Sequence, residues 1–209
     1  MISVRQQNFL LRKEKILAMA ETLLLDNNQD ITLSELATEL DIAKGTIYKH
    51  FKSKNQLYLE LIILNEKRLL ELSKKYNPNI QAYVSQYMLY NMLNSNRTIL
   101  LHVIEERLTN NERKLKDLFE ELYQIREERI LEIRDLFANH LKALNSTMSI
   151  RDYLSYIWTV TYGASLLLNS THYQKSIGSR ERLIKLYVKQ ALMTPDKLSE
   201  SNENIDTQA

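Results

Sequence analysis

The sequence predicts an all-α fold. It contains only three glycines and two prolines among 209 residues, so few positions interrupt a helix. Leu, Glu, Lys and Gln, which favour helix over strand, are plentiful. Apolar residues recur at spacings of three and four, which places them on one helix face. We expect about nine helices, with three in an amino-terminal domain and the rest in a larger carboxy-terminal helical domain.

The composition excludes several classes of site. Cysteine is absent, so no disulfide, thiolate nucleophile or cysteine-ligated metal is possible. No apolar run approaches the roughly 18 residues of a membrane span, and the amino terminus lacks the layout of a signal peptide. We therefore expect a cytoplasmic protein. The net charge is only +2, so any affinity for nucleic acid must come from local clusters of basic residues.

The first helix is expected at about residues 9–25, and it turns Ile16, Leu17 and Ala20 inward. Basic residues gather around its start, at Arg5, Arg12, Lys13 and Lys15. They are suited to contact a DNA phosphate or the minor groove, and they are equally typical of a solvated helix start. Both interpretations stay open.

Residues 32–54 predict two short helices joined by a tight turn. Thr32 or Ser34 caps the first helix, whose apolar face repeats at three and four. The pattern breaks at 41–43, the length of a helix-turn-helix turn. The second helix, 44–51, turns Ile47 and Phe51 inward. Its outer positions are short or basic: Lys44, Gly45, Thr46, Lys49 and His50.

The charge pattern suits this outer surface to the DNA major groove, which accepts a helix. Residues 42–54 hold four lysines and no acid, whereas residues 21–41 hold six acids and no Lys or Arg. We expect base or phosphate contacts from Lys44, Thr46, Lys49 and His50, and a phosphate contact from the Tyr48 hydroxyl. Gly45 lets the backbone approach the duplex. The residues expected to fix the register on the DNA backbone are Thr32, Ser34 and Lys54.

These residues carry a resemblance to a known family. The run LATELDIAKGTIYKHFKSKNQLY resembles the DNA-binding domain of the TetR family of bacterial transcriptional regulators. The matching positions are Ala37, Gly45-Thr46-Ile47-Tyr48, His50-Phe51, Lys54 and Leu57. Two positions depart from the family pattern. Asp41 stands where Gly is usual, in a turn that often adopts the left-handed conformation, and Ala43 stands where Ser is common, which removes a helix cap.

Further helices are expected to follow the helix-turn-helix. Ser53 and Gln56 form a capping-box pattern at the start of a helix that ends near Lys75. The remaining helices are expected at about 79–93, 96–108, 111–144, 149–169 and 179–193. We therefore expect a DNA-binding domain at 1–53, a regulatory and dimerisation domain at 54–195, and a disordered tail at 196–209.

Aromatic residues of the carboxy-terminal domain suggest a small-molecule pocket. The expected lining residues are Tyr87, Tyr90, His102, Tyr123, Arg126, Trp158 and Tyr162. A partly buried Arg126 would suit a ligand carboxylate. Tyrosines at helical spacing are also typical of core or interface packing, and the alternative for Arg126 is a pair with Glu127, Glu128 or a neighbouring helix. These alternatives stay open for every residue of the set.

The last two helices suggest an interface, because small residues there permit close helix approach. The resemblance implies a homodimer formed through these helices as a four-helix bundle. The expected interface residues are Gly163, Ser165, Leu166, Leu183, Tyr187 and Ala191. Ordinary packing within one chain is the alternative.

No enzyme signature is present, with neither a phosphate-binding glycine loop nor metal-ligand spacing among the four histidines. We expect no cofactor and no catalytic or metal site. The resemblance implies a repressor, nucleoid-associated when bound, that is released from a pseudo-palindromic operator in double-stranded DNA by a small-molecule effector of unknown identity. Two alternatives remain: a TetR-like protein without an inducer that works with a protein partner, and a helical enzyme or carrier with a borrowed helix-turn-helix.

Overall fold

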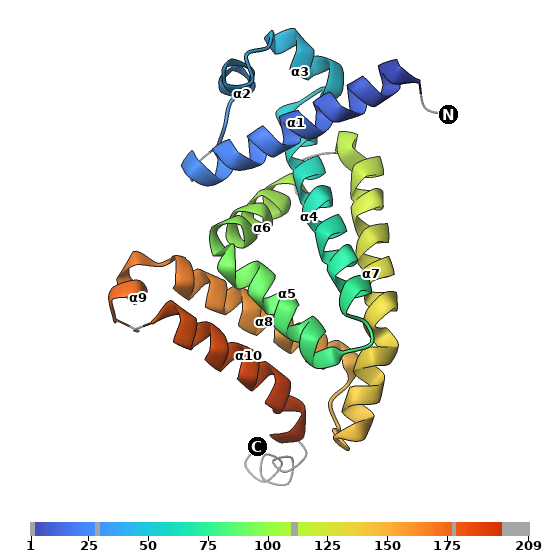
Figure 1. Ribbon diagram of the computed structural model, residues 1–209, viewed down its shortest axis with the longest axis vertical. Helices are drawn as coiled ribbons and strands as arrows, with labels where there is room; N and C mark the ends of the chain where they lie inside the picture. The colour runs from blue at the N-terminus through green and yellow to red at the C-terminus, as the bar shows by residue number, and fades with distance from the viewer. Residues whose placement is uncertain (1–2, 28–29, 110–112, 177–178, 198–209) are drawn as a thin grey trace. The chain divides into compact units, whose positions relative to one another are not determined.

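The computed structural model describes residues 3–27, 30–109, 113–176 and 179–197. These residues form ten α-helices and one 3₁₀ turn, Arg113–Leu115, and they contain no strand. The all-α prediction is confirmed. The helices are α1 (Val4–Asn27), α2 (Leu33–Glu39), α3 (Lys44–His50), α4 (Lys54–Tyr76), α5 (Ile80–Leu93), α6 (Ser95–Thr109), α7 (Lys116–Ala143), α8 (Ile150–Asn169), α9 (Thr171–Ser176) and α10 (Arg180–Lys197) (Figure 1).

The expected helices differ from the observed ones mainly at their ends: α1 begins at Val4, five residues before its expected start at residue 9. The short α9 was not predicted, and α10 continues past Pro195 to Lys197. Residues 198–209 of the expected tail lie outside the described residues. Polar side chains cap three helices: the oxygens of Ser53, Asn79 and Ser149 accept from backbone N–H groups three residues later at 3.1, 2.9 and 3.1 Å, and the cap at Ser53 confirms the prediction made from the sequence.

The chain forms two compact units. The first unit comprises Met1–Asn65 and Leu100–Tyr123, and the second comprises Glu66–Ile99 and Gln124–Ala209. Three helices, α4, α6 and α7, therefore contribute residues to both. The domain boundary expected after residue 53 stays a prediction, because a division by packing does not test a division by function.

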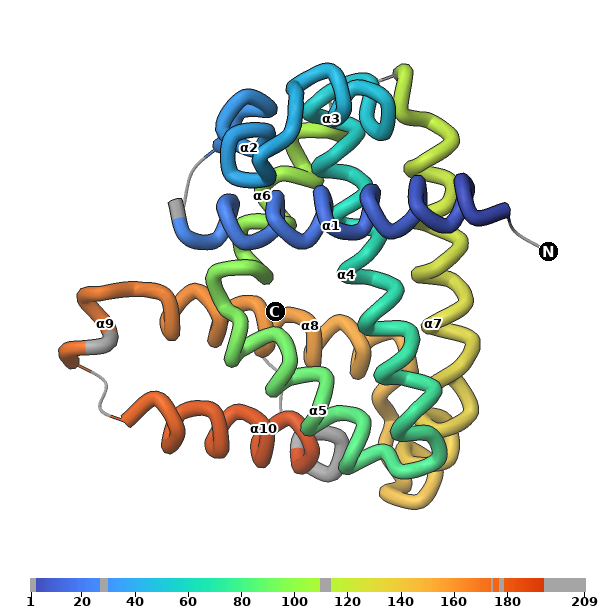
Figure 2. Tube along the Cα trace, turned by 45° about the horizontal axis from the view of Figure 1, so that its top comes forward, coloured from blue at the N-terminus to red at the C-terminus, as the bar shows by residue number. Residues whose placement is uncertain are grey.

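The first unit is built around the helix-turn-helix. Helix α2 packs against both α1 and α3 (Figure 2). The core of the first unit contains fully buried side chains from four helices. They are Ile16 of α1, Leu36 of α2, Ile47 of α3 and Leu57 of α4. The amphipathic spacing of each short helix explains this core, since burial of the apolar stripe stabilises helices too short to be stable alone.

The second unit packs α5 against α8 and α10. Figure 1 shows α8 and α10 side by side and running in opposite directions, joined through the segment that contains α9. The core between them includes Met88, Tyr153 and Ala191, and the Tyr153 hydroxyl donates to the Ala191 carbonyl over 3.0 Å. No helix among the described residues is long and apolar enough to cross a membrane.

Candidate functional site

Helix α2 begins with a capping box at Thr32. The Thr32 hydroxyl accepts from the Glu35 N–H at 3.1 Å, and the Glu35 carboxylate accepts from the Thr32 N–H at 2.7 Å. This second bond lowers the pKa of Glu35 below its ordinary value. The prediction that Thr32 caps the helix is confirmed. Thr32 and Ser34 are both exposed at this helix end.

The turn between α2 and α3 uses a left-handed residue. Asp41 has φ 49°, the conformation anticipated from its position where glycine is usual. The turn closes with the Ile42 N–H donating to the Ala37 carbonyl at 3.0 Å. Ala43 then occupies the N-cap of α3 and makes no side-chain hydrogen bond, as expected from the missing serine. The turn therefore carries local strain and an uncapped helix start.

Helix α3 separates an inner from an outer face. Ile47 and the following Phe51 are fully buried, whereas Lys44, Gly45 and Lys49 are exposed and Tyr48 is 47% exposed. A Cβ added at Gly45 would meet no atom within 4 Å. Packing within the protein therefore does not require glycine at this position, and the open space lies on the outer side of the helix.

His50 lies against α1 and not on the open outer face. Its ring stacks on Phe9 with the centroids 4.1 Å apart, and its Nδ1 is buried without a hydrogen-bond partner among the described residues. Burial, together with the charges of Arg12 and Lys13, lowers the pKa of His50. The imidazole is therefore mainly neutral at pH 7. The sequence pattern missed this stacking because Phe9 and His50 are far apart in the chain.

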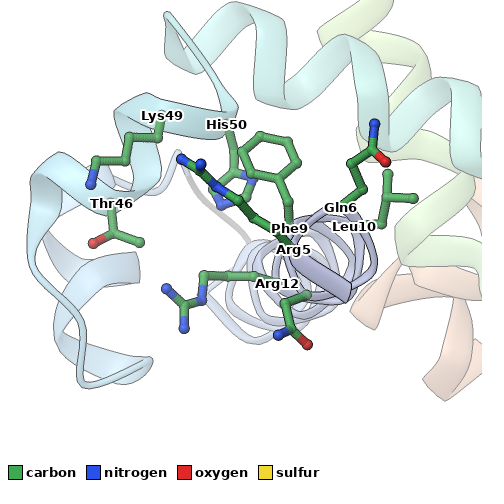
Figure 3. A pocket seen from close by; sticks show the side chains of 9 residues that line it. Arg5, Gln6, Phe9, Leu10, Arg12, Thr46, Lys49 and His50 are labelled. Atoms are coloured by element: carbon green, nitrogen blue, oxygen red, sulfur yellow. The ribbon is translucent and has the colours of Figure 1, made fainter. Parts of the chain in front are cut away.

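A groove of about 600 Å³ separates the start of α1 from α3 (Figure 3). Arg5 and Arg12 extend from α1 toward the side on which Thr46 and Lys49 project from α3. The groove residues are Arg5, Gln6, Asn8, Phe9, Leu10, Arg12, Thr46, Lys49 and His50. Arg5 and Arg12 are seven residues apart, or about two helical turns, so they share one face of α1. Among the described residues, three cations and no acid line the groove, which suits it to an anion such as a DNA phosphate.

Lys54 is engaged inside the first unit. Its Nζ donates to Asp30 Oδ2 at 2.8 Å and lies 5.5 Å from the centre of the Tyr58 ring. Burial alone would raise the pKa of Asp30, but the hydrogen bonds from Lys54 and Tyr58 and the charge of Arg107 bring it below its ordinary value. Lys54 thus stabilises the entry to α2, and a phosphate would compete with Asp30 for it.

The second unit contains a cavity of about 430 Å³ between α5, α7 and α8. Its lining residues are Tyr83, Tyr87, Arg129, Ile130, Ile133, Phe137, Leu154, Ser155, Ile157, Trp158 and Thr159. Of the predicted pocket residues, Tyr87 and Trp158 lie in this wall. His102 and Tyr123 belong to the first unit. Tyr90 lies beside Arg97, with the guanidinium carbon 4.4 Å from the ring centre, and Tyr162 stacks on Trp158 at 5.4 Å.

Arg126 binds a carboxylate of the protein itself. Its Nε donates to Glu66 Oε1 over 3.1 Å, and Arg129 Nε lies 3.4 Å from the other oxygen of the same carboxylate. Glu66 is buried. Arg129, which lines the cavity, was missed by the sequence pattern. Its position three residues after Arg126 was the available signal, because residues at that spacing share a helix face.

The predicted dimer residues divide into two groups. Ser165 and Ala191 are fully buried within the second unit, and the Ser165 hydroxyl donates to the Thr161 carbonyl at 2.8 Å. Gly163, Leu183 and Tyr187 are half-buried, and Leu166 is 47% exposed. Close packing of α8 on α10 inside one chain therefore accounts for the small side chains. The exposed apolar side chains of these two helices include the predicted Leu166 together with Leu186 and Met193, which were not predicted.

The amino-terminal part of the chain is similar in sequence to known transcriptional regulators. Residues 16–61 match the family of bacterial regulatory proteins called the tetR family. Over 82 residues the chain is 33% identical to the HTH-type transcriptional regulator QacR of Staphylococcus aureus, covering 39% of this chain and 44% of that protein. It is 32% identical over 84 residues to the HTH-type transcriptional regulator AcrR of Shigella flexneri, covering 40% of this chain and 35% of the other. The matched segment thus spans less than half of either relative.

The fold similarity extends over most of the chain. A crystal structure of a tetR-family regulatory protein from Rhodococcus RHA1 superposes with a TM-score of 0.67, covering 88% of this chain and 96% of that one. The two sequences are 18% identical, so this comparison concerns the fold alone. The helix-turn-helix geometry agrees with both comparisons: residues 16–61 match the tetR family of bacterial regulatory proteins, and most of the chain has the fold of a solved tetR-family protein.

Proposed function

We propose that this protein is a homodimeric DNA-binding transcriptional repressor that a small molecule releases from its operator. The outer face of α3 and the adjoining groove carry this proposal. Lys44, Tyr48 and Lys49 are exposed on one short helix, and Arg5 and Arg12 line the groove beside it. A helix in the major groove reads base edges, while basic groups flanking it neutralise phosphates.

The contacts divide by chemistry. Lys44 and Thr46 are placed to contact base edges or phosphates, and exposed Gly45 leaves room for the duplex to approach. Lys49, with Arg5 and Arg12, surrounds the groove and is suited to hold a phosphate. His50 takes part as the neutral, stacked floor of this groove. Because these cations are few, affinity depends on their convergence and not on the net charge of the chain.

A homodimer would present two copies of α3 to a pseudo-palindrome whose half-sites lie about 34 Å apart. The exposed apolar side chains of α8 and α10 support this part of the proposal. Leu166, Leu186 and Met193 are 47%, 48% and 40% exposed. Apolar groups on two adjacent, antiparallel helices suit a two-fold interface. In such an interface α8 and α10 of one protomer pack against α8 and α10 of the other.

The cavity of the second unit supports release by a small molecule. Its volume of about 430 Å³ lies within the range of about 300–1,000 Å³ usual for small-molecule sites. An inducer-independent regulator that works through a protein partner has less support, because it needs no such cavity. Helix α4 would connect ligand and DNA, since Glu66, beside the cavity residue Arg129, and Tyr58, beside the entry to α2, lie on the same helix.

Binding-site selection with purified protein and random or genomic DNA tests the function directly. A recovered two-fold-related sequence is the expected result. The affinity of wild type, Lys49→Ala and Lys142→Ala should then be measured by fluorescence anisotropy across a salt series. Lys49→Ala should weaken binding and reduce the slope of log K against log salt by about 1.

Lys142 provides the matched control, since it is an exposed lysine of α7 in the second unit. Its replacement should leave both the affinity and the slope unchanged. Failure to enrich any sequence would overturn the DNA-binding proposal. If a DNA sequence is enriched but all three proteins show the same salt slope, Lys49 does not contact the DNA. The proposal that the protein binds DNA would still stand.

A further inference from the structure

The wall of the second-unit cavity contains a single charged side chain among the described residues, Arg129. We propose that the cavity binds an amphipathic monocarboxylate, with an apolar or aromatic body and one carboxylate that pairs with Arg129. This inference rests on the proposed function, because it names the chemical class of the effector. It does not depend on the DNA site for its test.

Arg129 shares its carboxylate partner with a second arginine. Arg126 Nε and Arg129 Nε both face the carboxylate of Glu66, at 3.1 and 3.4 Å, so Arg129 does not have this carboxylate to itself. Arg129 Nε is buried, yet its approach to Glu66 does not form a well-aligned hydrogen bond. A guanidinium has five N–H donors, and with Glu66 and Tyr83 beside it the Nε donor of Arg129 still makes no hydrogen bond among the described residues. A second carboxylate, supplied by a ligand, completes the pairing of Arg129.

The polar groups around Arg129 are hydroxyls that can donate to a ligand, and the Tyr83 hydroxyl also accepts a hydrogen bond from Arg129. Tyr83 and Tyr87 line the cavity beside it, and the Arg129 guanidinium carbon lies 5.8 Å from the centre of the Tyr87 ring. Burial raises the pKa of Tyr87 to about 12 and raises that of Tyr83 as well, so both phenols keep their protons. Ser155 and Thr159 add hydroxyl groups. Donors of this kind stabilise a carboxylate and offer less to an ammonium group.

The rest of the wall is apolar and partly aromatic. Ile133, Phe137, Leu154 and Trp158 come from two helices, α7 and α8, and suit a flat or flexible hydrocarbon body. No acidic residue lines the cavity among the described residues. A cationic ligand would therefore meet the charge of Arg129 without a counter-ion, and a neutral one would leave Arg129 incompletely paired.

Trp158 gives a direct measurement, because it is the only tryptophan of the chain and it lines the cavity. It is 49% exposed, so a ligand that covers it should change its emission. Three probes of nearly equal shape differ in charge: 4-phenylbutyrate, 4-phenylbutanamide and 4-phenylbutylamine. Titration of the full-length protein at pH 7.5, with calorimetry as a second readout, compares their affinities.

We expect 4-phenylbutyrate to bind at least about tenfold more tightly than the amide, the effect of one charge-assisted hydrogen-bonded pair. The amine should bind most weakly. In Arg129→Met the preference for the acid over the amide should disappear. Arg134→Met is the matched control, because Arg134 lies on the same helix and its side chain is 59% exposed. That variant should keep the preference.

Arg129→Met also removes one partner of buried Glu66, so the variant requires a check of its fold by circular dichroism. If it does not fold, the double variant Glu66→Gln/Arg129→Met removes the unpaired carboxylate and is measured instead. The comparison of acid and amide in the wild-type protein needs no variant. Equal affinities, a preference for the amine, or no binding of any probe at millimolar concentration would overturn the proposal.

The outcome is separable from that of the proposed function. Binding of the acid without any effect on DNA affinity would support the ligand class and contradict release by this ligand. DNA binding that is indifferent to all three probes, together with unchanged Trp158 emission, would contradict the ligand class and leave the DNA-binding function untouched.

Discussion

The Tyr58 hydroxyl donates a hydrogen bond to Asp30 Oδ1 over 3.0 Å. The Tyr58 hydroxyl oxygen accepts from the Ile31 N–H at 3.1 Å, and the Tyr58 side chain is fully buried. Lys54 and Arg107 approach the Asp30 carboxylate at 2.8 and 3.5 Å. Within the first unit, therefore, one tyrosine near the start of α4 fixes the segment that leads into α2.

Replacement of Tyr58 by Phe should destabilise the first unit. The phenylalanine ring would still fill the site of the tyrosine ring. The Ile31 N–H would lose its buried acceptor, and the Asp30 carboxylate would lose the hydrogen bond that the Tyr58 hydroxyl donates. An unsatisfied buried group of this kind costs about 1–3 kcal/mol. The free energy of unfolding, measured by urea denaturation, should fall by that amount. Tyr173→Phe is the control, since Tyr173 is exposed, and it should change the value by less than about 0.5 kcal/mol. Equal stability of the two variants would contradict the structural role of the hydroxyl.

The parts of the fold that the sequence predicted correctly are those set by short-range patterns. The helix cap at Thr32, the turn at Asp41 and the inward face of Ile47 and Phe51 each depend on residues within a few positions of one another. Side-chain hydrogen bonding and helical spacing determine such features locally. The six-residue helix α9 escaped prediction because so short a segment shows no full period of apolar residues.

The candidate sites were less predictable, because they depend on residues distant in sequence. Glu66 and Arg129 meet from different helices, as do Phe9 and His50. No local pattern indicates which arginine of α7 will line a cavity, and Arg126 was the natural choice from its place in an apolar stripe. Small residues at Ser165 and Ala191 indicate close helix packing, but they do not distinguish a neighbouring helix of the same chain from that of a partner.

Asp41 offers a test of backbone strain in the turn. At φ 49° a β-branched residue is strongly disfavoured, whereas glycine adopts this conformation without steric strain. Asp41→Val should lower the free energy of unfolding by about 1–2 kcal/mol, and Asp41→Gly should leave it unchanged or raise it by up to about 1 kcal/mol. Thermal or urea unfolding checks both variants.

Asn145 serves as the reference for this comparison, because it has φ 50° and lies in the second unit. Asn145→Val should be destabilised by a similar amount. If Asp41→Val keeps the wild-type free energy of unfolding while Asn145→Val loses stability, the turn between α2 and α3 adjusts its conformation. That result would contradict the left-handed geometry of Asp41.

Ala43 offers the opposite kind of change, a gain of stability. Its φ of −64° and ψ of 136° are those of an N-cap residue, yet it supplies no hydrogen bond to the start of α3. Ala43→Ser should satisfy one free N–H of α3 and raise the free energy of unfolding by about 0.5–2 kcal/mol. Ala43→Val, which fits the same backbone region without a hydroxyl, is the control and should give no gain. A serine variant no more stable than wild type would contradict the uncapped start.

Two partly buried histidines predict the dependence of stability on pH. Burial lowers the pKa of His140, which stacks on Tyr153 with centroids 6.0 Å apart, and burial with nearby Arg12 and Lys13 lowers that of His50. Near pH 6 the unfolded chain therefore binds more protons than the folded one. Their contribution to stability is fully present above the ordinary histidine value of about 6.5 and is lost as the pH falls through the lower folded values.

The free energy of unfolding should accordingly rise between pH 5.5 and pH 7 and then level off, as measured by urea denaturation at fixed ionic strength. The double variant His50→Phe/His140→Phe keeps both ring stacks but cannot titrate, so its profile over this range should be flatter than that of the wild type. Each single variant should remove part of the slope. A wild-type profile that is level from pH 5.5, or a double variant with the wild-type slope, would assign the dependence to other groups.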